Sequence, residues 1–184
     1  LKTKPSQHSV KLLLESGIQP DVLVCRSEHP INKDIKKKIA LFCNVTPNSV
    51  IEALDMQTIY DVPMAMLKER LDKTVLTKLK LSAKNEPDMD SWLNFLTRHK
   101  NPKHEVKIGL VGKYVELKDS YKSIAEAFIH AGAANDIKVN LQWISSETMD
   151  TVDIAETLAG LDGILVAPGF GERGIAGKIN AVKF

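Results

Sequence analysis

Short β-rich runs alternate with amphipathic helical stretches along most of the chain, and no other feature restricts its fold as strongly. Such alternation predicts an α/β fold, because helices cross over between the strands of a largely parallel sheet. The first half is expected to hold strands at residues 21–25 and 49–54, the former buried because its apolar run is continuous. Helices are expected at residues 8–16 and 32–42 and, as one or two segments, between 63 and 81.

Apolar spacing assigns a core face to each of the first two helices. Asn32 is positioned to cap the second helix through its side-chain oxygen. The expected core faces are Val10, Leu13 and Leu14 on the first helix and Ile35, Ile39 and Phe42 on the second.

A polar segment at residues 82–104, punctuated by Pro87 and Pro102, interrupts the alternation. We interpret it as an interdomain connector that carries one short helix near residues 90–99. Beyond it, strands are expected at 106–111, 137–144 and 163–166, the last one buried, and helices at 120–134 and 152–158. The predicted division is therefore 1–81, 82–104 and 105–184. Both ends are expected to be cuts within a longer protein, since the chain lacks an initiator methionine and stops inside a helix at Phe184.

Composition excludes several classes of protein. The chain is 43% hydrophobic and 26% charged, a balance typical of a soluble globular domain. Its longest apolar runs are too short to span a bilayer, and a net charge of +2 is too small to indicate nucleic-acid binding. Cys25 and Cys43 lie in apolar stretches, which favours two buried thiols in a reducing compartment over a disulfide. We therefore expect a cytoplasmic protein with no membrane or nucleic-acid partner.

The segment Lys2-Thr3-Lys4-Pro5-Ser6-Gln7 precedes the first helix and is a candidate anion site. Free amide groups at a helix N-terminus bind anions, and proline fits the first helical turn. Two lysines, a hydroxyl and an amide supply the charge and the donors that a polyphosphate needs. The alternative is a basic segment that only keeps the chain soluble. Lys38 ends a run of three lysines, which a solvated helix face also explains.

Two further candidates follow predicted strands. Leu54, Asp55 and Met56 come after the second strand, where an open α/β sheet binds ligands, although a turn aspartate is the simpler explanation. The strand at 163–166 runs into a glycine-rich segment, Ala167-Pro168-Gly169-Phe170-Gly171. Its backbone N–H groups could form an oxyanion hole for acyl transfer, but a plain strand-to-helix turn has the same composition.

No complete catalytic constellation accompanies these segments. The G-x-S-x-G nucleophile motif is absent, and the five histidines are scattered along the chain. From the residues alone, the sequence indicates a two-part α/β protein with candidate anion and oxyanion sites.

The same stretches, taken in order, resemble the CTP synthase family. Six segments that cover nearly the whole chain carry the resemblance: LKTKPSQHSVK, GIQPDVLVCRSE, KIALFCNV, ALDMQTIYDVP, GLVGKYVELKDSYKSIAEAFIHAG and LDGILVAPGFGERGIAGKI. The first and the fifth are the most specific. The resemblance implies the end of a P-loop-type (Rossmann-like) amidoligase domain, followed by the start of a flavodoxin-like class I glutamine amidotransferase domain.

The resemblance also implies a reaction in pyrimidine nucleotide biosynthesis. The family uses ATP and Mg²⁺ to phosphorylate the 4-oxygen of UTP, and ammonia then displaces the phosphate to give CTP. The ammonia comes from glutamine, which a cysteine nucleophile hydrolyses with support from a histidine and a glutamate. GTP activates this glutaminase, and the family assembles as a homotetramer.

Site residues carry over position by position. By similarity, the UTP/CTP site, shared between subunits, is lined by Lys2, Thr3, Lys4, Pro5, Ser6, Gln7 and Lys38. Leu54, Asp55 and Met56 match the segment along the ATP adenine, and Gly169 matches a glutamine-binding glycine beside the oxyanion hole. Residues 113–122 resemble the region near the interface between the family's two domains, where GTP activates the glutaminase.

Two departures from the family pattern limit these assignments. Where the family usually has V-P-G-G-F-G, residues 166–171 read V-A-P-G-F-G, so Pro168 removes one N–H donor. The ATP phosphate loop, the Mg²⁺ carboxylates and the glutaminase nucleophile are also missing, so no catalytic residue or metal ligand is assigned within the chain. The alternatives are a non-catalytic nucleotide-binding or assembly module, and a different glutamine amidotransferase, in which the K-T-K-P segment would have no role.

Overall fold

The computed structural model describes residues 2–83 and 85–184, so Leu1 and Lys84, the latter within the expected connector, lie outside the described residues. The chain divides into two compact units, Leu1–Pro87 and Asp88–Phe184. No helix in the described ranges is both long enough and apolar enough to cross a bilayer.

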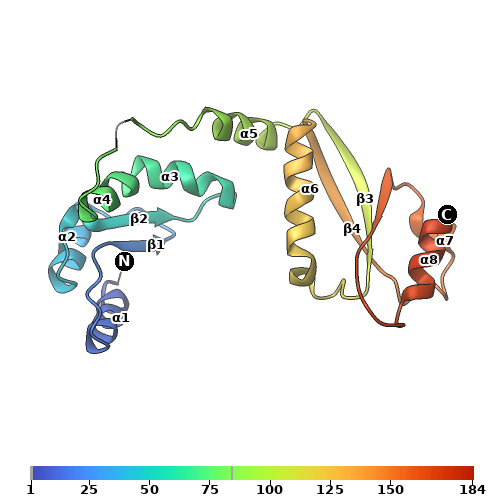
Figure 1. Ribbon diagram of the computed structural model, residues 1–184, viewed down its shortest axis with the longest axis horizontal. Coiled ribbons are helices and arrows are strands. Elements are labelled where there is room, and N and C mark those ends of the chain that lie inside the picture. The colour runs from blue at the N-terminus through green and yellow to red at the C-terminus, as the bar shows by residue number, and fades with distance from the viewer. Residues whose placement is uncertain (1, 84) are drawn as a thin grey trace. The chain divides into compact units, whose positions relative to one another are not determined.

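The first unit is built around a two-stranded parallel sheet (Figure 1). Strand β1 (Leu23–Ser27) pairs with β2 (Val50–Leu54) from Leu23 opposite Val50 to Ser27 opposite Leu54. The other elements of this unit are α1 (Lys4–Glu15), α2 (Lys33–Phe42), α3 (Val62–Lys68), α4 (Leu71–Lys78) and the 3-10 helices η1 (Pro47–Ser49) and η2 (Ile59–Asp61). The crossover through α2 gives the parallel arrangement that the alternation predicts.

Local signals set most of these boundaries. Asn32 Oδ1 accepts a hydrogen bond from the Ile35 N–H at 2.8 Å, which confirms the predicted N-cap of α2. Helix α1 begins at Lys4 rather than at residue 8, because Pro5 occupies its first turn and starts the helix earlier.

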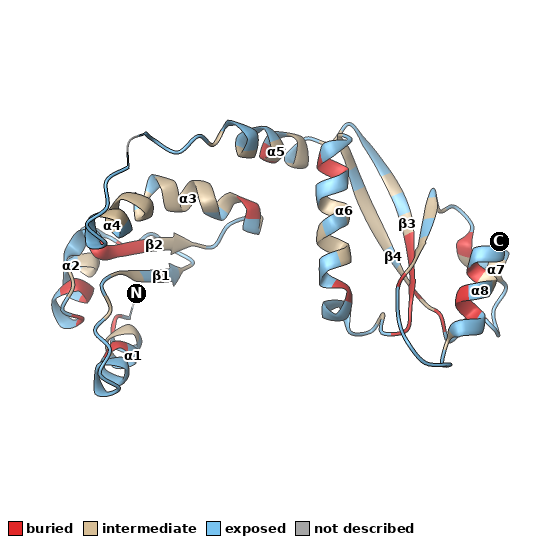
Figure 2. Ribbon diagram, viewed as in Figure 1, coloured by how far each residue is buried: buried red, intermediate tan, exposed pale blue. Residues whose placement is uncertain are grey.

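The predicted core faces are only partly correct. The first unit's core gathers Val10, Ile39, Ala40, Cys43 and Val50. Phe42 was expected in this core but is 60% exposed, and Leu13 and Leu14 are exposed as well. Figure 2 shows most of α1 in the colour of exposed residues. The prediction that β1 is buried is also wrong, because alternate residues are exposed and Val24 is 54% exposed. Within the described residues β1 pairs only with β2, so one of its edges and part of its surface are left uncovered.

The second unit contains a three-stranded parallel sheet in the order β4-β3-β5. Its elements are α5 (Asp90–Lys100), β3 (His104–Gly112), the 3-10 helix η3 (Lys118–Tyr121), α6 (Lys122–Ala134), β4 (Ile137–Ser145), α7 (Ile154–Leu158), β5 (Gly163–Val166) and α8 (Ile175–Lys183). Helix α5, which falls in the expected connector, belongs to this unit, where Phe95 stacks on His130 of α6 at 5.1 Å between ring centroids.

Successive residues of the central strand pack on opposite faces of this sheet. Leu110 joins Tyr121 and Ala167 on the α6 side, and Val111 joins Ile144 and Met149 on the side of α7 and α8. Figure 1 shows the same helices on the two faces. Strand β5 is half-buried rather than buried, because it lies at an edge of the sheet. The arrangement is that of a doubly wound α/β sheet.

Candidate functional site

The N-terminal segment and Lys38 line one cavity of about 450 Å³ in the first unit. Its lining residues are Lys2, Thr3, Lys4, Pro5, Ile35 and Lys38. Ile35 and Lys38 come from α2, and the other four residues surround the beginning of α1. Three lysines therefore line a single hollow at a helix N-terminus, and their positive charge favours an anionic ligand.

Thr3 fixes the first turn of α1 from a buried position. Its Oγ1 accepts a hydrogen bond from Gln7 Nε2 at 3.0 Å, and its carbonyl accepts one from the Gln7 N–H at 3.1 Å. Thr3 makes no side-chain cap to the helix amides. Gln7 lines a neighbouring cavity of about 820 Å³ together with Lys4 and Pro5. Ser6 lines neither cavity, so the structure brings five of the seven predicted UTP/CTP residues to the first cavity and joins Gln7 to it through Thr3.

The end of β2 and the two residues that follow it border a separate hollow of about 310 Å³. Leu54, Asp55 and Met56 all line it, and the remaining wall is largely apolar side chains from η2 and α3. Asp55 Oδ1 accepts a hydrogen bond from Arg26 Nε at 2.7 Å, and this hydrogen bond raises the pKa of the exposed guanidinium further. An apolar wall with a charged rim suits a flat heterocycle with polar edges.

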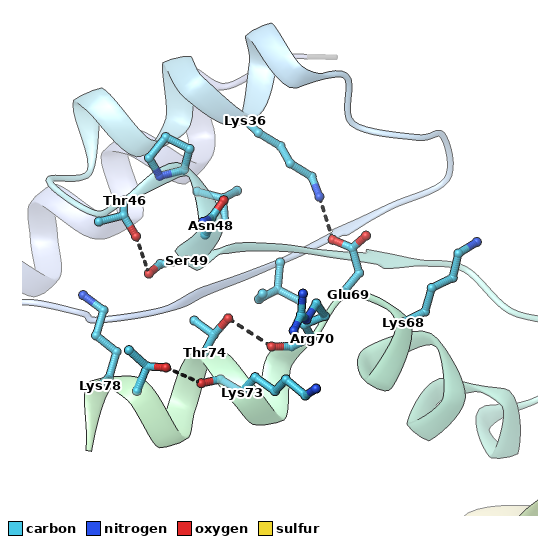
Figure 3. Close-up of a pocket in the computed structure, with 14 residues that line it drawn as sticks. Lys36, Thr46, Asn48, Ser49, Lys68, Glu69, Arg70, Lys73, Thr74 and Lys78 are labelled. Atoms are coloured by element: carbon cyan, nitrogen blue, oxygen red, sulfur yellow. Dashed lines mark hydrogen bonds and ion pairs between the residues drawn. The ribbon is translucent and has the colours of Figure 1, made fainter. Parts of the chain in front are cut away.

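A fourth cavity, of about 560 Å³, was not anticipated from the sequence (Figure 3). It is lined by residues of α2, η1, β2, α3 and α4, and five of them are cationic: Lys36, Lys68, Arg70, Lys73 and Lys78. Glu69 Oε2 accepts hydrogen bonds from Lys36 Nζ at 2.6 Å and from the Glu52 N–H at 3.0 Å. Partial burial favours a higher pKa for Glu69, but these hydrogen bonds and nearby lysines hold the pKa below its ordinary value.

The glycine-rich turn of the second unit is held by two buried lysines. Lys113, immediately after β3, donates through Nζ to the carbonyls of Phe170 at 2.6 Å and Gly171 at 2.9 Å. Lys178, in α8, donates to the Ala167 carbonyl at 2.8 Å. The sequence interpretation missed both contacts. The only available signal was a lysine placed after a strand and another in the helix that follows the turn.

Gly169 lies between these two lysines. A Cβ at this position would lie 3.2 Å from Lys178 Nζ and 3.6 Å from Lys113 Cδ. The side chain of the next residue, Phe170, is fully exposed. A side chain at 169 would therefore press on the flexible end of Lys178 and contact Lys113 at ordinary distances.

The described residues show no cluster of candidate metal ligands. No group of three or more His, Cys, Asp or Glu side chains among them could hold a metal ion. No metal-dependent step is therefore assigned to residues of this chain.

Comparison with known proteins agrees with the order of the two units. Residues 1–81 match the family model described as CTP synthase N-terminus, and residues 116–184 match glutamine amidotransferase class-I. Over all 184 residues the chain is 65% identical to the CTP synthase of Cytophaga hutchinsonii and 62% identical to that of Flavobacterium psychrophilum. Both alignments cover the whole chain and 34% of the relative.

The chain belongs to the CTP synthase family.

A CTP synthase from a third organism also matches the whole chain. The CTP synthase of Methanocaldococcus jannaschii is 56% identical over 190 aligned positions, again across the whole chain. The family resemblance and the fold class predicted from the sequence are thereby confirmed. The chain spans about a third of the length of the curated CTP synthases that it matches. The individual ligand roles of the site residues remain predictions.

Proposed function

We propose that this chain is part of an enzyme that aminates UTP to CTP, using ATP and ammonia released from glutamine. Curated CTP synthases between 52% and 65% identical to the chain over its whole length support this assignment. A different glutamine amidotransferase is disfavoured, because the N-terminal unit matches the CTP synthase N-terminus. The remaining alternative is a non-catalytic nucleotide-binding or assembly module. The coding sequence that flanks this segment would distinguish such a module from an enzyme.

In this proposal the chain supplies binding surfaces rather than reacting groups. Residues 1–81 form the end of the synthetase domain, 82–104 the connector, and 105–184 the start of the glutaminase domain. Lys2, Lys4 and Lys38 neutralise the triphosphate of UTP or CTP, while Leu54, Asp55 and Met56 lie along the adenine of ATP. Gly169 contacts glutamine. The glutaminase nucleophile and the phosphate loop belong to regions outside this segment, and so do the carboxylates for Mg²⁺.

The localisation, assembly and regulation of the protein are inferred by similarity to the family. We propose a cytoplasmic homotetramer that GTP activates, with UTP, CTP, ATP and glutamine as its ligands. ATP bound with Mg²⁺ would supply the phosphoryl group, and the residues of this chain would hold and orient the nucleotides.

The observation that carries this proposal is the single cavity shared by Lys38 and the Lys2–Pro5 segment. In the full-length enzyme, Lys38→Ala should weaken UTP saturation and CTP inhibition together by roughly tenfold or more. A charge-assisted hydrogen bond contributes about 1.5–3 kcal/mol, and 1.4 kcal/mol is about tenfold in affinity.

Lys37→Ala is the matched control, because Lys37 precedes Lys38 on the same helix, is exposed and lines none of the four cavities described. It should leave both nucleotide dependences unchanged. Equal effects of the two substitutions, or no effect of Lys38→Ala, would return Lys38 to a solvated helix face.

A further inference from the structure

Two buried lysines meet at one short turn, and each is satisfied by backbone carbonyls alone. Lys113 is 5% exposed and Lys178 is 8% exposed. Lysine is almost never buried to this degree unless its ammonium has partners. Within the described residues, neither ammonium forms an ion pair with a carboxylate, and their hydrogen bonds go to the carbonyls of Ala167, Phe170 and Gly171.

This arrangement is costly, so a purely structural explanation is weak. Burial lowers the pKa of Lys178, and the charge of Lys113 lowers it further. A methionine of similar length would fill the same space without desolvating a charge. What the ammonium groups add is directed hydrogen bonding to the backbone of the turn.

The geometry of the peptide group determines where the N–H groups of the turn point when its carbonyls are held. In a trans peptide the carbonyl and the following N–H point to opposite sides. When Lys113 holds the carbonyls of Phe170 and Gly171, the N–H groups of Gly171 and Glu172 are turned away from the buried side. Lys178 anchors the start of the same turn at Ala167.

Besides the two lysines, the Ala167 N–H holds the start of the turn by donating to the Val111 carbonyl at 2.8 Å, whereas the residues that follow have few such contacts. Gly169 and Gly171 lack side chains, and the Phe170 side chain is exposed. Glycine loses more conformational freedom on ordering than any other residue, so an unsupported turn of this composition would sample many backbone shapes. Pro168 also offers no N–H, so fewer donors remain and their orientation matters more.

We propose that Lys113 and Lys178 are positioning residues for glutamine hydrolysis, which hold the turn 167–171 so that its amide groups face the substrate. This inference rests on the proposed function. Neither lysine touches the reacting atoms. Both act through the backbone of the turn, which must be ordered before it can stabilise the developing oxyanion.

The test uses the full-length enzyme with Lys113→Met and Lys178→Met, and Lys183→Met as the control. Lys183 lies in α8 as Lys178 does, but it is exposed. CTP formation is measured separately with glutamine and with free ammonia, each without GTP and with saturating GTP. We expect kcat with glutamine to fall at least tenfold in both Met variants. Synthesis from ammonia should stay within about twofold, and the control should match wild type. Lys113→Arg, which keeps a charged donor, should recover part of the lost activity.

Other outcomes overturn the inference. Equal losses with glutamine and with ammonia, in Lys113→Arg as well as in the Met variants, would mean that the lysines only support folding. A loss seen only when GTP is present would assign Lys113 to activation instead.

Amide hydrogen exchange at residues 167–172 separates this inference from the proposed function. Exchange should be faster in both Met variants and unchanged in Lys183→Met, whatever reaction the enzyme catalyses. If the wild-type enzyme forms no CTP from either nitrogen source, the proposed function fails while the exchange result still stands. Unchanged exchange in both Met variants would refute the positioning role itself.

Discussion

Replacing Gly177 with alanine should destabilise the second unit, although helix propensity alone predicts the opposite. Gly177 is buried in the first turns of α8, against the turn that follows β4. A Cβ at this position would lie 1.9 Å from the carbonyl oxygen of Ser146 and 2.9 Å from the Cβ of Met149. The first of these neighbours is backbone, so it cannot rotate out of the way.

The magnitudes decide the sign of the effect. An alanine is more favourable than a glycine inside a helix by about 1 kcal/mol. Against this, ordinary contacts between heavy atoms lie near 3.5 Å, so the new methyl group would be roughly 1.5 Å too close to Ser146. Helix α8 would have to shift away from Met149 and from the core around Ala181. Overpacking of this kind costs about 1–3 kcal/mol and occasionally more. Because the overlap is with backbone, we expect a cost in the upper part of this range, about 2–3 kcal/mol, and therefore a net loss of about 1–2 kcal/mol in the free energy of unfolding.

Tryptophan fluorescence measures this unit selectively, because both tryptophans, Trp92 and Trp143, lie within it. With a urea dependence of about 1–2 kcal/mol per molar, the unfolding midpoint should fall by roughly 1 M. Ala176→Gly, at the exposed neighbouring position, calibrates the effect of propensity in the same helix. A midpoint for Gly177→Ala above that of the wild type would refute the predicted clash.

Two further predictions concern thiol reactivity and acid stability. Burial raises the pKa of both cysteine thiols, but Cys43 is fully buried whereas Cys25 is only partly buried. A thiol reagent at pH 8 should therefore label Cys25 first, and label Cys43 only as the first unit opens; equal rates would contradict the packing. In the second unit, hydrogen bonds from Arg98 and Lys103 hold the pKa of Asp136 below the ordinary value of an aspartate. The stabilisation from Asp136 is present above that value and is lost as the pH falls through its folded-state pKa. Asp136→Asn should therefore flatten the loss of stability on acidification below about pH 4. Urea unfolding followed by tryptophan fluorescence at several pH values measures this loss. An unchanged slope would show that the ion pairs contribute nothing.

Local pattern by itself determined the order and type of the elements. The strand predicted at 163–166 has the same bounds in the structure, and Asn32 caps α2 as its side chain predicts. These features could be recognised because strand alternation, helical periodicity and capping depend on residues a few positions apart. The family resemblance also depended on sequence alone, since whole motifs such as LKTKPSQHSVK are specific without any coordinates.

The tertiary structure alone decided which surfaces are covered and which side chains meet. Phe42 has the right spacing for a core position but is exposed, because no described element packs over it. A run of lysines looks the same in sequence whether or not one of them reaches a cavity, and only the packing of α2 beside α1 brings Lys38 to the segment that contains Lys4. Lys113 and Lys178 were missed for the same reason. Their partners are backbone carbonyls, which every residue possesses. No pattern of residue types therefore indicates which carbonyls a lysine will contact. That depends on how the strands and helices are arranged in space.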